Sequence, residues 1–162
     1  MKKILLPCLC LMIVLSTNAQ LKVKAECDPF YVDILNGTVN KVKPNHTPGE
    51  IKLKLPCSSG SEEEGPAAKC GGSITYKGQD VVFYTQRNII EIGPKYKGKM
   101  SIPLLGASRT KLFPLLGSPQ LKDDNWEAFQ TAYGILILYY TAGKVNRILM
   151  SSENATTIQL CQ

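Results

Sequence analysis

The chain has 162 residues and a formal net charge of +6. This length suits one ordinary domain with its own hydrophobic core. No block of five basic residues occurs, so the charge is typical of a soluble protein and does not indicate a nucleic-acid partner.

The first 19 residues have the pattern of a secretory signal peptide. Two lysines at the start precede an apolar run over residues 4–15, and Thr17-Asn18-Ala19 gives a small-residue cleavage site. The run is shorter than the roughly 20 apolar residues of a transmembrane helix. We therefore expect residues 1–19 to be removed, leaving a periplasmic or secreted protein of residues 20–162 with a charge of +4 and no membrane span.

Two of the six cysteines, Cys8 and Cys10, lie inside the apolar run, too early for a lipoprotein anchor. Four cysteines in an exported chain imply two disulfides with three possible connectivities. The simplest choice pairs the two cysteines that are close in sequence, and pairs the two that lie near the ends of the mature chain. This choice predicts Cys57–Cys70 and Cys27–Cys161. No two of the four remaining cysteines have close ligand spacing and His46 is the only histidine, so we expect no metal site and no cofactor.

The segment Thr47-Pro48-Gly49-Glu50 predicts the start of a helix, with an N-cap, a proline in the first turn and a capping-box glutamate. Ile51 and Leu55 share a face of that helix, and Pro56 ends it. Alternation over residues 51–55 also fits a strand, but the capping box favours the helix. The polar segment 58–69, with three consecutive glutamates, is predicted to be a solvated loop.

Three apolar runs separated by turn residues, 73–76, 80–85 and 89–93, predict an antiparallel meander. A second helix is expected over residues 108–116, with Ser108 as its cap, Gly117 at its end and Pro114 shortening or kinking it. Residues 126–133 fit either a helix or a strand. The apolar segment 134–141 is typical of a buried strand, and residues 145–150 are predicted to form the strand that returns beside it.

The two halves of the chain show an internal similarity. Val81-Val82-Phe83-Tyr84-Thr85 matches Ile137-Leu138-Tyr139-Tyr140-Thr141 in residue type, and each run is followed by a three-residue turn and a returning strand. The helix over 47–55 likewise matches the one over 108–116. The similarity predicts two tandem repeats over about 38–98 and 99–152, with Tyr84 equivalent to Tyr140. The alternative is that two hairpins of an α+β protein look alike.

The second half also resembles a known repeat unit. The segments that carry the resemblance are Ile102-Pro103-Leu104-Leu105-Gly106-Ala107-Ser108, Leu115-Leu116-Gly117-Ser118-Pro119, Tyr133-Gly134-Ile135 and Tyr139-Tyr140-Thr141-Ala142-Gly143-Lys144-Val145, with Leu112 and Ile148. This pattern is similar to the repeat of β-lactamase-inhibitory proteins and of the small outer-membrane-assembly lipoproteins of the same fold. In those families a helix ending in Leu-Gly-x-Pro precedes a strand, a Gly-Lys-Val turn and a strand, and the inhibitors carry two units in tandem.

The resemblance covers most of residues 38–152, although its motifs are short. It implies an α+β fold: two helix-plus-meander repeats forming one two-layer, disulfide-stapled domain, with an expected Cys57–Cys70 bridge that resembles the inhibitors' disulfide near a helix end. Two departures stand out, because the second half has no disulfide of its own and the chain has no lipobox. A shared fold does not fix the partner.

Candidate catalytic residues do not form a recognisable pattern. His46 suits a surface loop at a helix start, and Ser108 lacks a Gly-x-Ser-x-Gly elbow. Carboxylate pairs for glycosidic chemistry are not selected by spacing. The carboxylates considered are Asp80, Glu91, Asp123, Asp124 and Glu127. We therefore do not expect an enzyme.

Aromatic residues gather in the predicted strands, and the neighbours in Phe83-Tyr84 and Tyr139-Tyr140 must point to opposite sheet faces. One of each pair is expected in the core and the other on the second face, where tyrosine and tryptophan make good binding anchors. Two short helices can cover one face only, so we expect the other face to be open, with Trp126 at its rim. The alternative is that helices or loops cover this face too.

These observations favour a protein-binding module that acts outside the cytoplasm, of the inhibitor or immunity type, with a protein as its partner. The alternatives are an envelope-assembly protein and a small-ligand-binding protein with a pocket between sheet and helices; an enzyme ranks last.

Overall fold

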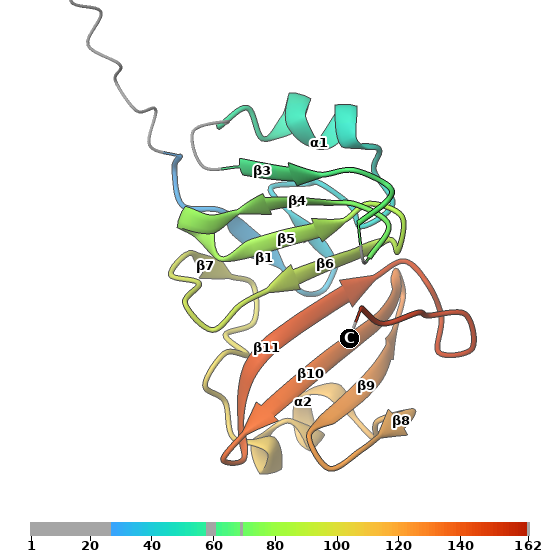
Figure 1. Ribbon diagram of the computed structural model, residues 1–162. Helices are drawn as coiled ribbons and strands as arrows, with labels where there is room; N and C mark the ends of the chain where they lie inside the picture. Colours follow the sequence, from blue (N-terminus) through green and yellow to red (C-terminus); the bar gives the residue numbers. More distant parts are fainter. Residues whose placement is uncertain (1–26, 58–60, 69, 162) are drawn as a thin grey trace, which may run out of the picture.

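A computed structural model of the chain describes residues 27–57, 61–68 and 70–161, and its main element is an eight-stranded antiparallel sheet (Figure 1). The expected signal segment, with Cys8 and Cys10, lies outside the described residues. The sheet order is β3-β4-β5-β6-β11-β10-β9-β8. The strand bounds are β3 (Ser61–Glu64), β4 (Ser73–Tyr76), β5 (Val81–Tyr84), β6 (Ile89–Ile92), β8 (Leu121–Lys122), β9 (Trp126–Thr131), β10 (Gly134–Thr141) and β11 (Lys144–Ser151).

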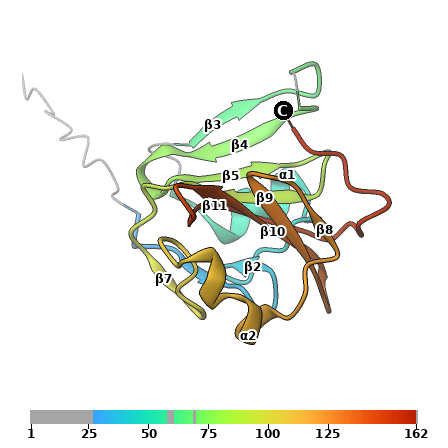
Figure 2. The same ribbon diagram turned by 90° about the horizontal axis from the view of Figure 1, so that it is seen from below.

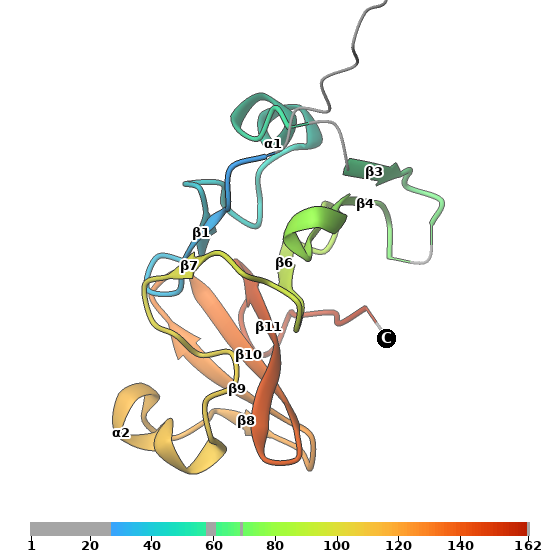
Figure 3. The same cartoon turned by 90° about the vertical axis from the view of Figure 1, so that its left-hand side faces the viewer.

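A second layer covers one face of this sheet, called the inner face below (Figures 2 and 3). It contains a small sheet of β1 (Tyr31–Asp33), β2 (Thr38–Val39) and β7 (Lys99–Met100), and the helices α1 (Pro48–Lys54) and α2 (Phe113–Leu116). Its apolar side chains and those of the inner face form the main core. Core members include Phe30, Val32, Ile51, Leu104 and Leu112 from the layer, and Phe83, Ile92, Leu138, Tyr140 and Ile148 from the sheet. The α+β class is therefore confirmed, although an N-terminal segment does much of the covering expected of helices.

Helix α1 forms as its capping box predicts. The Thr47 hydroxyl accepts a hydrogen bond from the Glu50 amide at 3.3 Å, and the Glu50 carboxylate accepts one from the Thr47 amide at 2.8 Å. Ile51 and Leu55 are buried against the core, whereas Leu53 on the other side is 81 % exposed. The cap thus outweighs the strand-like alternation of this segment.

The second helix is broken, as Pro114 predicts. A 3-10 turn (Arg109–Lys111) precedes the four-residue α2, which ends at Gly117. Ser108 is not a side-chain cap: its hydroxyl hydrogen bonds to Thr110 at 3.0 Å, and its backbone bridges to Lys144. Within the described residues, no helix is long and apolar enough to cross a bilayer.

The three-stranded meander is confirmed as β4, β5 and β6, and a 3-10 turn (Lys77–Gln79) connects β4 to β5. The segment 126–133, which fits either class, forms strand β9. The glutamate-rich segment was predicted to be a loop, and this is wrong: it contains β3, an edge strand paired with β4. Its Ser-Glu-Glu-Glu sequence has no apolar alternation, so only the pairing with β4 makes it a strand, and its charges suit a sheet edge.

The disulfides join Cys27 to Cys57 and Cys70 to Cys161, so the predicted connectivity is wrong although all four cysteines are bridged. The reason is β3. Its first residue pairs with the last residue of β4, and its last with the first, so the chain between Cys57 and Cys70 spans the length of a strand. Cys57 is left beside the N-terminal segment, and Cys70 beside the C-terminal one. Two disulfides are typical of proteins from oxidising compartments.

Each half of the chain places a short helix before a four-stranded antiparallel meander, and the two meanders meet through β6 and β11. The predicted residue-by-residue equivalence is nevertheless wrong. Tyr84 points away from the core and Tyr140 points into it, because the two runs differ in phase by one residue. The connections also differ: four residues join β5 to β6, whereas Ala142-Gly143, both at positive φ, form a two-residue hairpin turn.

The opposite face of the sheet, called the outer face, is partly covered by the C-terminal segment (Figure 3). Ala155, Ile158 and Leu160 pack on a second apolar cluster formed by Ile89, Ala128, Ile135, Ile137 and Leu149. The Cys70–Cys161 bridge and a hydrogen bond between Arg87 and Gln159 hold this segment to the first meander. The expectation of a fully open face is therefore wrong, since a non-helical segment covers part of it.

Candidate functional site

The five aromatic candidates divide between the two faces as strand alternation predicts. Phe83 and Tyr140 are 1 % and 7 % exposed and belong to the main core, so neither can contact a partner. Tyr84, Tyr139 and Trp126 are half-buried around the outer-face cluster. A half-buried aromatic set of three residues therefore remains on the outer face.

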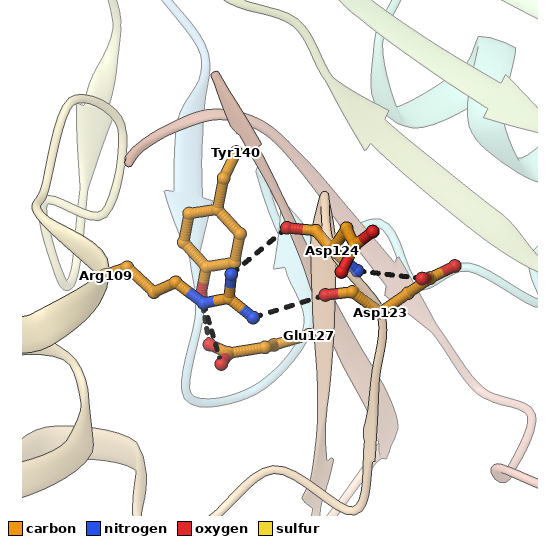
Figure 4. Close-up of polar contacts among 5 residues, drawn as sticks. All are labelled: Arg109, Asp123, Asp124, Glu127 and Tyr140. Carbon is orange, nitrogen blue, oxygen red and sulfur yellow. Dashed lines mark hydrogen bonds and ion pairs between the residues drawn. The ribbon is translucent and has the colours of Figure 1, made fainter. Parts of the chain in front are cut away.

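One cluster of an arginine, a glutamate and a tyrosine lies on the inner side, near α2 (Figure 4). Arg109 Nε donates to Glu127 Oε1 at 2.9 Å, and Tyr140 Oη donates to Glu127 Oε2 at 2.6 Å. The other two guanidinium nitrogens donate to the backbone oxygens of Asp124, at 3.1 Å, and Asp123, at 3.2 Å. The guanidinium also lies over the Tyr140 ring, 4.9 Å from its centroid.

This cluster is satisfied internally. All three guanidinium nitrogens of Arg109 donate, and both oxygens of Glu127 accept. Burial, and next the hydrogen bond to Glu127, raises the pKa of Tyr140, so this phenol stays protonated and keeps donating at physiological pH. The cluster ties the 3-10 turn to the loop before β9, and we assign it a structural role.

A second set of the same residue types lies on the outer face. Glu91 on β6 accepts a hydrogen bond from Tyr84 Oη at 3.3 Å and lies 3.9 Å from Arg147 on β11. The Arg147 guanidinium lies over the Tyr139 ring, with 3.9 Å from Cζ to the ring centroid. Tyr139 pairs across strands with Trp126. Tyr84, Glu91, Arg147, Tyr139 and Trp126 are called the outer-face row below.

Burial sets the protonation of this row. It raises the pKa of Glu91, with Arg147 opposing the shift. Burial, and then the nearby Glu91 charge, raises the pKa of Tyr84 to about 12. The ion pair between Glu91 and Arg147 is too long for a hydrogen bond, so it anchors the guanidinium loosely.

A β-bulge in β11 brings two polar side chains to the outer face together. The register pairs Tyr139 with Arg147 and Tyr140 with Val145, so Asn146 is the extra residue. Val145 and Ile148 both point into the main core, which leaves Asn146 and Arg147 between them facing outward. Bulges commonly redirect side chains next to functional sites.

These residues border a shallow pocket of about 560 Å³ beside the β10–β11 hairpin. Its lining includes Arg147, Asn146, Tyr139, Asn125, Pro94 and Ala142. Asn146 Nδ2 donates to Thr141 at 2.6 Å, but its buried Oδ1 has no partner among the described residues. A pocket with a guanidinium stacked on an aromatic ring is suited to holding a planar polar group.

The catalytic candidates lie apart, except that Asp123, Asp124 and Glu127 lie around Arg109 (Figure 4). His46 accepts a hydrogen bond from the Lys43 amide at 3.3 Å, and burial lowers its pKa. Asp80 accepts from the Lys95 amide at 2.6 Å and so fixes a turn. Glu127 belongs to the inner cluster. In the described part of the chain, no three His, Cys, Asp or Glu side chains are grouped so that they could hold a metal ion.

Arg147 and Asn146 were not predicted as site residues. The sequence shows them as adjacent residues of a strand, which would point to opposite faces. The bulge that places both outward has no signal in the sequence. Glu91 was considered only as a catalytic carboxylate, and its place beside Arg147 depends on the pairing of β6 with β11.

No family model matches this chain, and neither a curated protein nor a solved structure matches it.

Proposed function

We propose that the protein is an exported binding module that holds a protein partner on its outer face. The observation that carries the proposal is the outer-face row: three half-buried aromatic side chains and an arginine on one surface. Tyrosine, tryptophan and arginine are the residue types most enriched among side chains that dominate binding energy. The four side chains lie on paired strands, so little conformational freedom is lost when a partner binds.

The localisation is part of the proposal. Two disulfides fit a periplasmic or secreted protein, and the signal-like N-terminal sequence supplies a route out of the cytoplasm. The proposed activity is binding, because the outer-face row brings aromatic side chains and a guanidinium together on one surface.

We further propose the inhibitor or immunity type, with two tandem repeats, on the strength of topology. Two helix-plus-meander halves joined edge to edge are what the resemblance to β-lactamase-inhibitory proteins implies. The repeats would be offset by one residue from the sequence match, so that Tyr84 corresponds to Tyr139. An envelope-assembly role remains the alternative within this class.

The test is affinity capture from the envelope and extracellular fractions of the source cells with disulfide-bonded mature protein as bait. Three baits are compared: the wild type, Tyr84→Ser/Tyr139→Ser, and Leu53→Ser. Leu53 is an exposed apolar residue on α1, in the other layer, and so is a matched control. A partner bound by the wild type and by Leu53→Ser but lost with the tyrosine variant supports the proposal. A partner that all three baits retain places binding elsewhere and contradicts it.

A second candidate function is small-ligand binding, which the pocket of about 560 Å³ favours. Its position differs from the expectation, since it lies on the outer face and not between sheet and helices. A thermal-shift screen of small polar molecules tests this function: a shift of the wild type that Arg147→Met abolishes would favour a ligand over a protein partner.

A further inference from the structure

We infer that the pocket beside Arg147 receives the carboxylate of an aspartate or glutamate side chain carried by the protein partner. The inference rests on the proposed function and specifies the chemistry of the contact. It depends on the unused donors of Arg147, on the bulge that places this side chain outward, and on the aromatic ring beneath it.

Arg147 has unused hydrogen-bonding capacity. Its guanidinium contacts the Tyr139 ring and the distant Glu91 carboxylate, and it makes no hydrogen bond to any residue that the structure describes. Its side chain is 37 % exposed, almost the same as the 34 % of Arg109, whose three guanidinium nitrogens all donate. The two arginines are therefore equally exposed but differ in their hydrogen bonds: Arg109 is fixed within the fold, whereas Arg147 is available to a ligand.

The surroundings favour a carboxylate over other ligands. A guanidinium binds a carboxylate through two parallel N–H···O bonds, and contact with an aromatic ring orients it without using those donors. The acid beside it, Glu91, lies 3.9 Å from the guanidinium, too far for a hydrogen bond, so the donors of Arg147 stay available to a ligand. The rim carries charges of both signs: the exposed Lys95 and Lys144 lie close in sequence to the lining residues Pro94 and Ala142, and the exposed Asp123 and Asp124 precede the lining residue Asn125.

The aromatic side chains around Arg147 favour a protein as the carrier of that carboxylate. Tyr139, whose ring lies under the guanidinium, and its cross-strand neighbour Trp126 offer apolar contacts next to the pocket. A free anion would satisfy Arg147 but would leave these aromatic side chains without a contact.

The experiment is a selection of disulfide-cyclised random peptides on the disulfide-bonded mature protein. We expect the enriched peptides to share an aspartate or glutamate at one fixed position. Changing that residue to its amide should weaken binding at least about tenfold. Arg147→Met should weaken the acidic peptides similarly and remove the difference between acid and amide peptides. Lys122→Met, which removes an exposed cation from the edge strand β8, should change neither affinity.

The outcomes separate the two proposals. Peptides that need Tyr139 but have no fixed acidic residue, or that keep the acid–amide difference in Arg147→Met, would overturn the carboxylate pocket and leave the binding face intact. Peptides that are insensitive to Tyr84→Ser/Tyr139→Ser, or no enriched peptides at all, would overturn both. Inorganic phosphate is tested in parallel, and a shift of the Arg147 Nε–H NMR signal by phosphate, but by no selected peptide, would identify an anion site and contradict the inference.

Discussion

An arginine, a glutamate and a tyrosine occur together twice in this molecule, once on each side of the sheet. Around Arg109 the contacts are short: 2.9 Å from Arg109 to Glu127 and 2.6 Å from Tyr140 to Glu127. On the outer face the matching distances are 3.9 Å from Arg147 to Glu91 and 3.3 Å from Tyr84 to Glu91. The inner cluster is complete in itself, whereas the outer-face row has donors to spare.

The difference shows that residue types alone do not identify a site. A guanidinium whose donors are all engaged contributes to stability, and its removal leaves a carboxylate without its partner. One with free donors contributes little to stability and can meet a ligand at small cost. Substitutions in the inner cluster should therefore lower stability, and substitutions in the outer-face row should mainly weaken binding.

The largest effect should come from the bridge that ties the C-terminal segment over the outer face. Replacing Cys70 and Cys161 by serine should lower the free energy of unfolding by about 4 kcal/mol, because the bridge closes a loop of 91 residues. The matched variant without Cys27 and Cys57, whose loop spans 30 residues, should lose about 1 kcal/mol less. Denaturant unfolding under non-reducing conditions measures both. A larger loss in the second variant would mean that the C-terminal segment adds little to the fold.

The next largest loss of stability should come from one of two neighbouring substitutions on β5, whose side chains point to opposite faces of the sheet. Phe83→Ala should cost about 3–4 kcal/mol because it opens a cavity in the main core. The adjacent Tyr84→Ala should cost about 1 kcal/mol, since this side chain is only half-buried. Urea unfolding of both variants provides the measurement. Equal losses would show that the outer face is packed as a second core and would weaken its role as a binding surface.

The two arginines provide the direct comparison. Arg109→Met should lower the free energy of unfolding by about 2 kcal/mol, because Glu127, whose side chain is 14 % exposed, loses its ion pair. Arg147→Met should change it by no more than about 0.5 kcal/mol, because this ion pair is 3.9 Å long and makes no hydrogen bond that the substitution would remove. Chemical denaturation at neutral pH checks both values. Equal costs would contradict the assignment of separate structural and binding roles.

The smallest effect concerns pH. The folded-state pKa of Glu91 is raised by burial, so its stabilising contribution is present below the unfolded-state pKa and is lost as the pH rises through the folded-state value. The stability of Glu91→Gln relative to the wild type should therefore increase from about pH 4 to pH 7. Parallel unfolding curves at these two pH values test the direction.

Glu153 offers a control of opposite sign. Its pKa is lowered chiefly by the hydrogen bond from Asn88, so its contribution is present above the unfolded-state pKa and is lost as the pH falls. Glu153→Gln should lose stability relative to the wild type over the same rise in pH. Matching signs for the two variants would contradict the burial of Glu91.

Several elements could be predicted because their causes are local. The capping box fixed α1 against a competing strand pattern, Pro114 shortened α2, and alternation divided Phe83 from Tyr84 between the two faces. Each depends on residues within one or two turns or along one strand. Alternation also predicted that one member of each aromatic pair is buried, but not which one, because it says only that neighbouring side chains point to opposite faces.

What the sequence determined by itself is therefore the class of the fold, the positions of most strands, and four cysteines available for two bridges. The tertiary structure alone decided which cysteines meet, because β3 becomes a strand only by pairing with β4 and thereby separates Cys57 from Cys70. It also decided which arginine is free. The bulge at Asn146 and the covering of the outer face by the C-terminal segment arise from pairing and packing between segments far apart in the chain, and no local pattern encodes such contacts.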